Sequence, residues 1–102
     1  MSVVVVAHIR PLPEHLDAVR EAVLAAVPHV HAEPGCELYA LHEVDGVLVF
    51  VEKWASQEAL DVHMTAPALT ALGPQLAGKV TGAPEVEILT PSPTGDATKG
   101  AV

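Results

Sequence analysis

The stretch Val47-Leu48-Val49-Phe50-Val51-Glu52-Lys53-Trp54 is the strongest strand signal in this chain of 102 residues. It is mostly β-branched, aliphatic or aromatic and contains no Gly or Pro. Side chains alternate between the two faces of a strand. One face is therefore valine ending in a lysine, and the other carries Leu48, Phe50, Glu52 and Trp54. A carboxylate between two aromatic rings is unusual, so we expect Glu52 either to be exposed at a strand end or to line a cavity.

The residues before this stretch predict its antiparallel partner. Cys36–Glu43 reads as a strand, with Tyr39 on one face and His42 on the other. Between the two strands lies Val44-Asp45-Gly46, and Asp-Gly is a strong hairpin signal. The sequence therefore predicts a β-hairpin at the centre of the fold.

The N-terminal part predicts a strand followed by a helix. Residues Val3–Arg10 begin with four valines, and the prolines after them end the strand. Residues Glu14–Ala32 carry an apolar stripe at spacings of three and four, which is typical of an amphipathic helix. Pro28 cannot donate a hydrogen bond to the carbonyl of Leu24, so we expect a kink or an early end there.

The C-terminal part predicts further helices and a last strand. Ser56 is a candidate N-cap for a helix over residues 57–65. A short helix starts at Pro67, and we expect Gly73-Pro74 to interrupt it. Glu85–Thr90 reads as the last strand. Residues 1–90 then form the folded domain, and the composition of residues 91–102 predicts a disordered tail.

The order β-α-β-β-α-β is that of a ferredoxin-like α+β fold, a four-stranded antiparallel sheet with its helices on one face. The strands are apolar on both faces, although the helices cover only one. The uncovered face needs another partner, and a second copy of the same sheet is the simplest one. The pattern therefore predicts a face-to-face homodimer.

The composition bears on partners and compartment. A net charge of −8 argues against binding to nucleic acid or an anionic membrane, and no apolar run is long enough to span one. A lone cysteine and the lack of a visible signal peptide favour the cytoplasm. His29 and His31 do not share a helix face, so we expect no metal site. No phosphate loop or dinucleotide fingerprint is present, and we expect no cofactor.

Three short motifs carry a resemblance to a known family. They are Glu33-Pro34-Gly35-Cys36, then Glu52-Lys53-Trp54, then Ala59-Leu60-Asp61-Val62-His63. In this order and spacing the chain resembles the antibiotic biosynthesis monooxygenase (ABM) domain family over roughly residues 3 to 90. The resemblance implies a dimeric α+β barrel and, for some members, cofactor-independent oxygenation of quinols or polycyclic phenols. Other members isomerise small phosphorylated ketones or degrade haem. The haem-degrading branch relies on an Asn, and this chain has none.

Oxygenation without a metal or flavin requires a base that deprotonates a phenol, and two residues are candidates. Glu52 qualifies if burial raises its pKa towards neutrality. His63, on the following helix, has an ordinary pKa suited to proton transfer near neutral pH. The structural alternatives are that Glu52 satisfies a backbone donor or a partner-chain cation, and that His63 lies on the helix surface.

The candidate substrate-binding residues are Trp54, Phe50, His8, Arg10 and Tyr39. The aromatic residues would hold a flat ring, and Arg10 would orient an anionic oxygen. Each also has a purely structural interpretation, such as core packing for Trp54 and Tyr39 or an ion pair for Arg10.

We therefore expect a monooxygenase that acts on a quinol or polyphenolic aromatic substrate with dioxygen. An isomerase or other non-oxygenating enzyme on the same fold is the first alternative. A non-catalytic dimeric ligand-binding module is the second.

Overall fold

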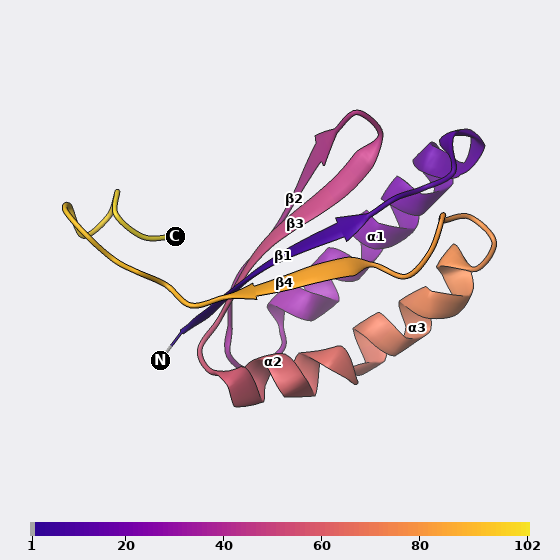
Figure 1. The fold of residues 1–102 in the computed structure, drawn as a ribbon. Helices are drawn as coiled ribbons and strands as arrows, with labels where there is room; N and C mark the ends of the chain where they lie inside the picture. The colour runs from indigo at the N-terminus through magenta and orange to yellow at the C-terminus, as the bar shows by residue number, and fades with distance from the viewer. Residues whose placement is uncertain (1) are drawn as a thin grey trace.

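The strand β3 (Val47–Trp54) lies inside a four-stranded antiparallel sheet in the computed structural model, which describes residues 2–102. The strand order is β2 (Cys36–Val44), β3, β1 (Val3–Ile9) and β4 (Glu85–Leu89). The helices lie on one side of this sheet (Figure 1). The prediction of a ferredoxin-like α+β fold is confirmed.

The helical layer consists of a short 3₁₀ turn, η1 (Pro13–His15), and three α-helices. These are α1 (Leu16–His31), α2 (Gln57–Met64) and α3 (Pro67–Leu76). The Ser56 side chain accepts a hydrogen bond from the backbone N–H of Ala59 and so caps α2, as expected. Within residues 2–102, no helix is both long and apolar enough to cross a membrane.

The early end expected at Pro28 and the interruption expected at Gly73-Pro74 are absent, while the kink expected as the alternative at Pro28 stays a prediction. Helix α1 continues through Pro28 to His31, because its last turn is held by the packing of Val30, which is 1% exposed. The carbonyl of Leu24, which loses its helical donor, belongs to an exposed residue that water can reach. Helix α3 likewise continues through Pro74 to Leu76. The carbonyl that loses its donor there belongs to Thr70, which is also exposed. Packing of the apolar stripe therefore outweighs the lost hydrogen bond in both helices.

The β2–β3 hairpin fixes which face of β3 points inwards. Asp45 and Gly46 both have positive φ, 49° and 76°, as a two-residue type I′ turn requires. The burial of β3 then alternates strictly, with the Leu48, Phe50, Glu52 and Trp54 side chains buried under the helices. The valines of β3 lie on the opposite face. The carboxylate of Glu52 is thus directed into the molecule.

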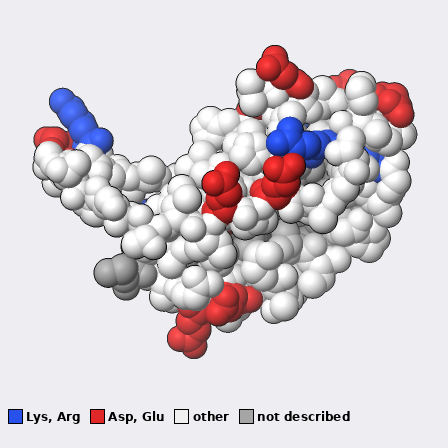
Figure 2. Space-filling view, viewed as in Figure 1, with Lys and Arg blue, Asp and Glu red and all other residues white. Residues whose placement is uncertain are grey.

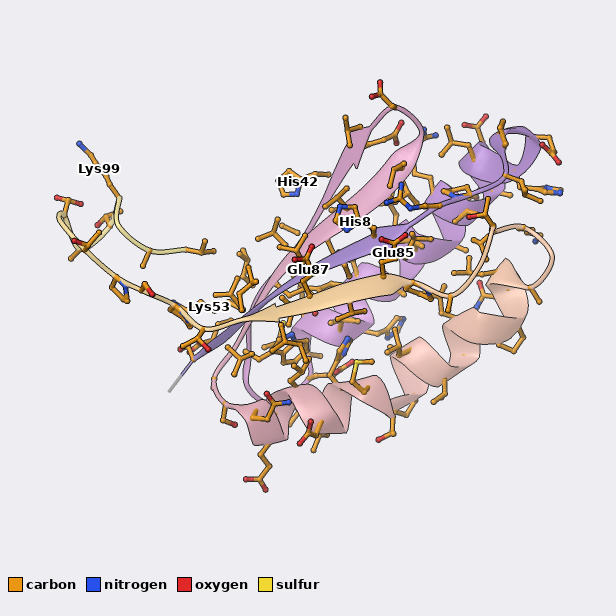
Figure 3. All side chains as sticks on the ribbon, viewed as in Figure 1. His8, His42, Lys53, Glu85, Glu87 and Lys99 are labelled. Atoms are coloured by element: carbon orange, nitrogen blue, oxygen red, sulfur yellow. The ribbon has the colours of Figure 1, made fainter. Side chains whose placement is uncertain are left out.

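No helix of the described residues 2–102 covers the opposite face of the sheet (Figure 1). Figure 2 shows this side of the molecule, where uncharged residues make up most of the surface. Figure 3 shows His8, His42, Glu85 and Glu87 on the strands of this side. We call it the outer face.

Beyond Leu89 the chain forms no helix or strand and runs away from the sheet (Figure 1). The backbone carbonyl of Val102 accepts a hydrogen bond from Lys53 Nζ at 2.9 Å. The predicted division into a folded domain and a disordered tail stays a prediction.

Candidate functional site

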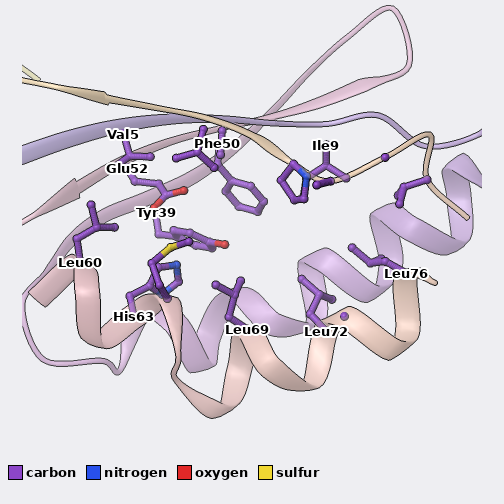
Figure 4. A pocket seen from close by; sticks show the side chains of 18 of the residues that line it. Val5, Ile9, Tyr39, Phe50, Glu52, Leu60, His63, Leu69, Leu72 and Leu76 are labelled. Atoms are coloured by element: carbon purple, nitrogen blue, oxygen red, sulfur yellow. The ribbon is translucent and has the colours of Figure 1, made fainter.

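A cavity of about 410 Å³ lies between the inner face of the sheet and helices α2 and α3 (Figure 4). Apolar side chains form most of its wall. The lining side chains with hydrogen-bonding nitrogen or oxygen atoms are Tyr39, Glu52 and His63. In Figure 4 these three lie together at one end, and Leu72 and Leu76 lie towards the other. The cavity therefore has a polar end and an apolar end.

Exposed lining residues mark where the cavity reaches solvent. Met64 on α2 is 48% exposed, and Val86 on the edge strand β4 is 42% exposed. The loop after α3 borders the apolar end, where the lining residues Gly82, Ala83 and Pro84 are exposed as well. Backbone hydrogen bonds of 2.9 Å join this loop to the segment after β1: Leu12 N–H donates to the carbonyl of Lys79, and Thr81 N–H donates to the carbonyl of Arg10.

A close backbone approach determines where α2 lies. Gly35 has φ of +81°, and a Cβ built there would lie 2.6 Å from the Cβ of Ala59 on α2. Only a glycine allows α2 to approach the turn before β2 this closely. His63 follows Ala59 by one helical turn, so the same approach brings His63 to Glu33, which precedes the turn.

The imidazole of His63 is held on three sides. Its Nδ1 lies 2.8 Å from Glu33 Oε1. Its ring stacks on Trp54, with centroids 4.4 Å apart, and meets Tyr39 edge-on at 5.6 Å. The residue is 2% exposed. Its position is consequently set by contacts from β2, β3 and the turn between α1 and β2.

The carboxyl group of Glu52 is buried, with 4% of the residue exposed. Trp54 Nε1 donates a hydrogen bond of 2.9 Å to Glu52 Oε1. Burial raises the pKa of Glu52 and nearby Glu33 adds to the rise, whereas the Trp54 hydrogen bond and the charge of His63 oppose it. Glu52 thus has an environment that favours its protonated form more than water does.

Tyr39 and Phe50 form the aromatic part of the wall. Their rings stack with centroids 4.3 Å apart and an interplanar angle of 23°. Burial raises the pKa of Tyr39, and the charges of Glu52 and Glu33 raise it further. Its hydroxyl therefore stays protonated at physiological pH and can donate a hydrogen bond into the cavity.

The structure brings four of the predicted site residues together in the cavity wall: Glu52, His63, Phe50 and Tyr39. It does not bring Trp54, His8 or Arg10 there. Trp54 is 0% exposed, because the His63 ring covers it on the cavity side and its Nε1 is used by Glu52.

His8 and Arg10 are kept from the cavity by strand alternation. The side chains of β1 that line the cavity are Val5, Ala7 and Ile9, so the residues between them face outwards. His8 lies on the outer face beside Glu85 (Figure 3). Arg10 is exposed and forms an ion pair with Glu85, with Nε and Oε1 2.9 Å apart.

Glu33 is a site residue that the sequence interpretation did not single out. It appeared only as part of the motif before Cys36. One signal in the sequence could have pointed to Glu33: its motif occurs together with the motif on the following helix that contains His63. For metal binding, residues 2–102 contain no group of three or more His, Cys, Asp or Glu placed to hold an ion.

Comparison with known proteins gives consistent results. The family model described as antibiotic biosynthesis monooxygenase matches residues 2–73. A Mycobacterium tuberculosis protein named "Putative monooxygenase Rv0793" is 33% identical over 91 residues, which are 87% of this chain and 90% of that protein. The solved structure of Rv0793 has a TM-score of 0.85 at 31% identity, covering 94% of this chain and 100% of that one. A Caulobacter crescentus structure whose name carries the same family description has a TM-score of 0.79 at 29% identity, covering 86% and 87%.

Proposed function

The chain belongs to the antibiotic biosynthesis monooxygenase family, and on that premise we propose that it oxygenates a quinol or polyphenolic substrate with dioxygen and without a cofactor. The observation that carries the proposal is the cavity with Glu52, His63 and Tyr39 at one end of an otherwise apolar wall. A phenol has the matching shape, a polar hydroxyl on an apolar ring.

The cavity also bears on the size and charge of the ligand. Leu69, Leu72 and Leu76 line it along α3, and at about 1.5 Å per residue the first and last are roughly 10 Å apart. Its volume lies in the range of small-molecule sites. No Lys or Arg is among the lining residues, so a phosphorylated or carboxylated ligand would be left without a counter-charge. This favours an uncharged aromatic ligand over the phosphorylated ketones of the isomerase alternative.

The proposed reaction needs no external reductant, because the substrate supplies all the electrons. Conversion of a hydroquinone to a hydroxyquinone is a four-electron oxidation. One oxygen atom enters the ring, and the other leaves as water with the two remaining electrons and two protons. The protein then has to bind the ring, accept a proton and return one, and limit the access of water.

We assign the two proton transfers to His63 and Glu52. Nε2 of His63 accepts the phenolic proton, and the phenolate then transfers one electron to dioxygen. The two radicals combine to a ring peroxide anion, and the proton held by His63 converts this anion to the hydroperoxide. The O–O bond then breaks, the distal oxygen leaves as water, the carbonyl product forms, and the ring C–H proton that is lost replaces the proton given by Glu52. Glu52 donates the proton that lets the distal oxygen leave, a task for which its raised pKa is suited.

Oxygen consumption with a panel of quinols under air tests the proposal. With ¹⁸O₂, one labelled atom is expected in the product and the other in water. His63→Gln is expected to lower kcat by roughly 10²- to 10⁴-fold, the usual contribution of general acid–base catalysis. Glu58→Gln, at an exposed position of α2, is the matched control and should leave kcat unchanged.

Other outcomes point to the alternatives. Turnover that persists unchanged without oxygen indicates a non-oxygenating enzyme. Saturable binding of quinols with no conversion by the wild-type protein indicates a ligand-binding module. Either result would overturn the proposed oxygenation.

We also propose that the outer face joins two copies of this chain. The centre of the outer face is a surface of valines from β1 and β3, most of them half-buried in the single chain. The two edge strands beside it, β2 and β4, carry different polar residues. His42 lies on β2, whereas Glu87 lies on β4 (Figure 3). A two-fold axis between the two sheets and parallel to the strands would set the acidic edge of one copy against the histidine edge of the other.

Light scattering coupled to size-exclusion chromatography tests this arrangement. The wild-type protein is expected to elute with twice the mass of one chain. Val51→Asp, on the outer face, is expected to shift it to the single-chain mass, while Val62→Asp, at a 53% exposed position of α2, leaves it unchanged. A single-chain mass for the wild type would contradict the dimer.

A further inference from the structure

We propose that Glu33 is a positioning residue that holds His63 with a proton on Nδ1 and leaves Nε2 free on the cavity side. The consequence for catalysis depends on the proposed function, whereas the assignment of the proton depends on geometry alone. Neither Glu33 nor its pairing was among the residues expected to form the site.

Glu33 and the cavity lie on different sides of the His63 imidazole. His63 lines the cavity, but Glu33 does not. Glu33 borders a shallower groove between α1 and α3, where His29 and Pro67 are its neighbours. The carboxylate therefore contacts the edge of the ring that faces away from the ligand.

The contact determines the tautomer of the neutral ring. An ionised carboxylate has no proton to donate, so across the 2.8 Å contact Nδ1 must be the donor. In a neutral imidazole the other nitrogen then carries a lone pair. Within residues 2–102, Nε2 of His63 has no hydrogen-bond partner, and it is not among the fully buried atoms that lack one. It is therefore the atom open to a ligand.

The surroundings leave the ring little freedom to turn. Trp54 covers one of its faces at a centroid distance of 4.4 Å, and Tyr39 contacts it edge-on. The Glu33 side chain is itself 11% exposed. A 180° flip of the ring would exchange Nδ1 with Cδ2 and Nε2 with Cε1, so Glu33 Oε1 would face a carbon and lose its one partner within residues 2–102.

A second observation indicates that the carboxylate serves His63 rather than stability. Glu33 Oε2 is buried and has no hydrogen-bond partner, the one such side-chain oxygen or nitrogen in residues 2–102. A buried carboxylate with an unsatisfied oxygen is unfavourable for folding. Its charge is, however, well placed to stabilise the imidazolium that forms when Nε2 takes a proton from the ligand.

Nitrogen-15 NMR of the imidazole side chains tests the proton assignment without any substrate. The wild-type His63 signals are expected to be those of the tautomer with Nδ1 protonated. Glu33→Gln keeps an acceptor oxygen and should retain that tautomer, whereas Glu33→Ala should show mixed tautomers or the other one. A wild-type ring protonated on Nε2, or an unchanged tautomer in Glu33→Ala, would overturn the proposal.

Kinetics with the quinol turned over by the wild type test the effect on catalysis. Glu33→Ala is expected to lower kcat by roughly 10²-fold with KM changed by less than about threefold, since Glu33 does not line the cavity. Glu33→Gln should lower kcat less. Equal kcat in all three proteins would refute the positioning role. If no quinol is converted by the wild type, the proposed oxygenation fails, and the NMR result still decides the placement of the proton.

Discussion

Replacing Glu52 by Gln should make the protein more stable at neutral pH. The Glu52 carboxyl is 4% exposed, and burial raises its pKa above the ordinary value. A carboxyl whose pKa is higher in the folded state holds its proton more tightly there. Its destabilising effect is therefore absent below the unfolded pKa of about 4.3, grows as the pH rises, and is complete above the folded pKa.

The magnitude follows from the hydrogen bonds of the group. An ionised carboxylate can accept about four hydrogen bonds, and Glu52 accepts one from within residues 2–102, donated by Trp54. The second oxygen of Glu52 is not among the fully buried ones and keeps contact with the cavity, so the cost is at most that of a buried polar group that lacks partners, about 1–3 kcal/mol. Glutamine keeps an acceptor for Trp54 and carries no charge. We expect Glu52→Gln to unfold with a free energy higher by about 1–3 kcal/mol at pH 8, with the difference falling towards zero at pH 4.

Denaturant unfolding at a fixed protein concentration measures this difference. Trp54 is the only tryptophan of the chain and reports the transition by fluorescence. The exposed substitution Glu58→Gln is the control and should follow the wild-type pH dependence. A Glu52→Gln protein that is no more stable than the wild type at pH 8, or that gains equally at pH 4 and pH 8, would refute the reasoning. A gain in stability with a loss of turnover would identify Glu52 as a residue kept for function.

Three further substitutions test the framework around the site. Gly35→Ala places a Cβ 2.6 Å from that of Ala59 at a positive φ, and it should lower the free energy of unfolding by about 2 kcal/mol or more. Gly73→Ala is its control, since a Cβ there meets nothing within 4 Å, and denaturant midpoints should show no loss. Ser56→Ala removes the cap of α2 and should cost about 1 kcal/mol by the same measurement. Arg20→Gln breaks exposed ion pairs from α1 and should leave the denaturant midpoint almost unchanged, with any small loss vanishing in 1 M salt.

The sequence predicted the fold because the decisive signals are local. The Asp45-Gly46 turn and the alternation of β3 are properties of a few adjacent residues, and both operate as expected in the structure. β2 has an irregular register between Cys36 and Leu38, yet Tyr39 still reaches the core. The early end expected at Pro28 and the interruption expected at Gly73-Pro74 were wrong, because a local rule was outweighed there by packing between distant segments.

The site was harder to predict for two physical reasons. Strand β1 is apolar on both faces, so its pattern does not say whether Val5 or His8 points inwards. Alternation also gives the direction of a side chain but not its depth. Trp54 faces the helices as Glu52 does, and it is nevertheless hidden behind His63, which comes from a different element. Glu33 has no periodic signal at all, because its role depends on a contact 30 residues away along the chain.

Residues of the three sequence motifs contact one another in one region of the fold, and these contacts explain why each position needs its residue type. The missing side chain of Gly35 lets α2 approach the turn, and the small Ala59 accepts that approach. The approach places His63, one turn further, against the carboxylate that precedes the glycine. Trp54 then fills the space behind the imidazole and hydrogen-bonds the acid beside it. A change at any of these positions therefore alters the relative placement of the two proposed proton-transfer groups, even when the altered residue does not contact a ligand.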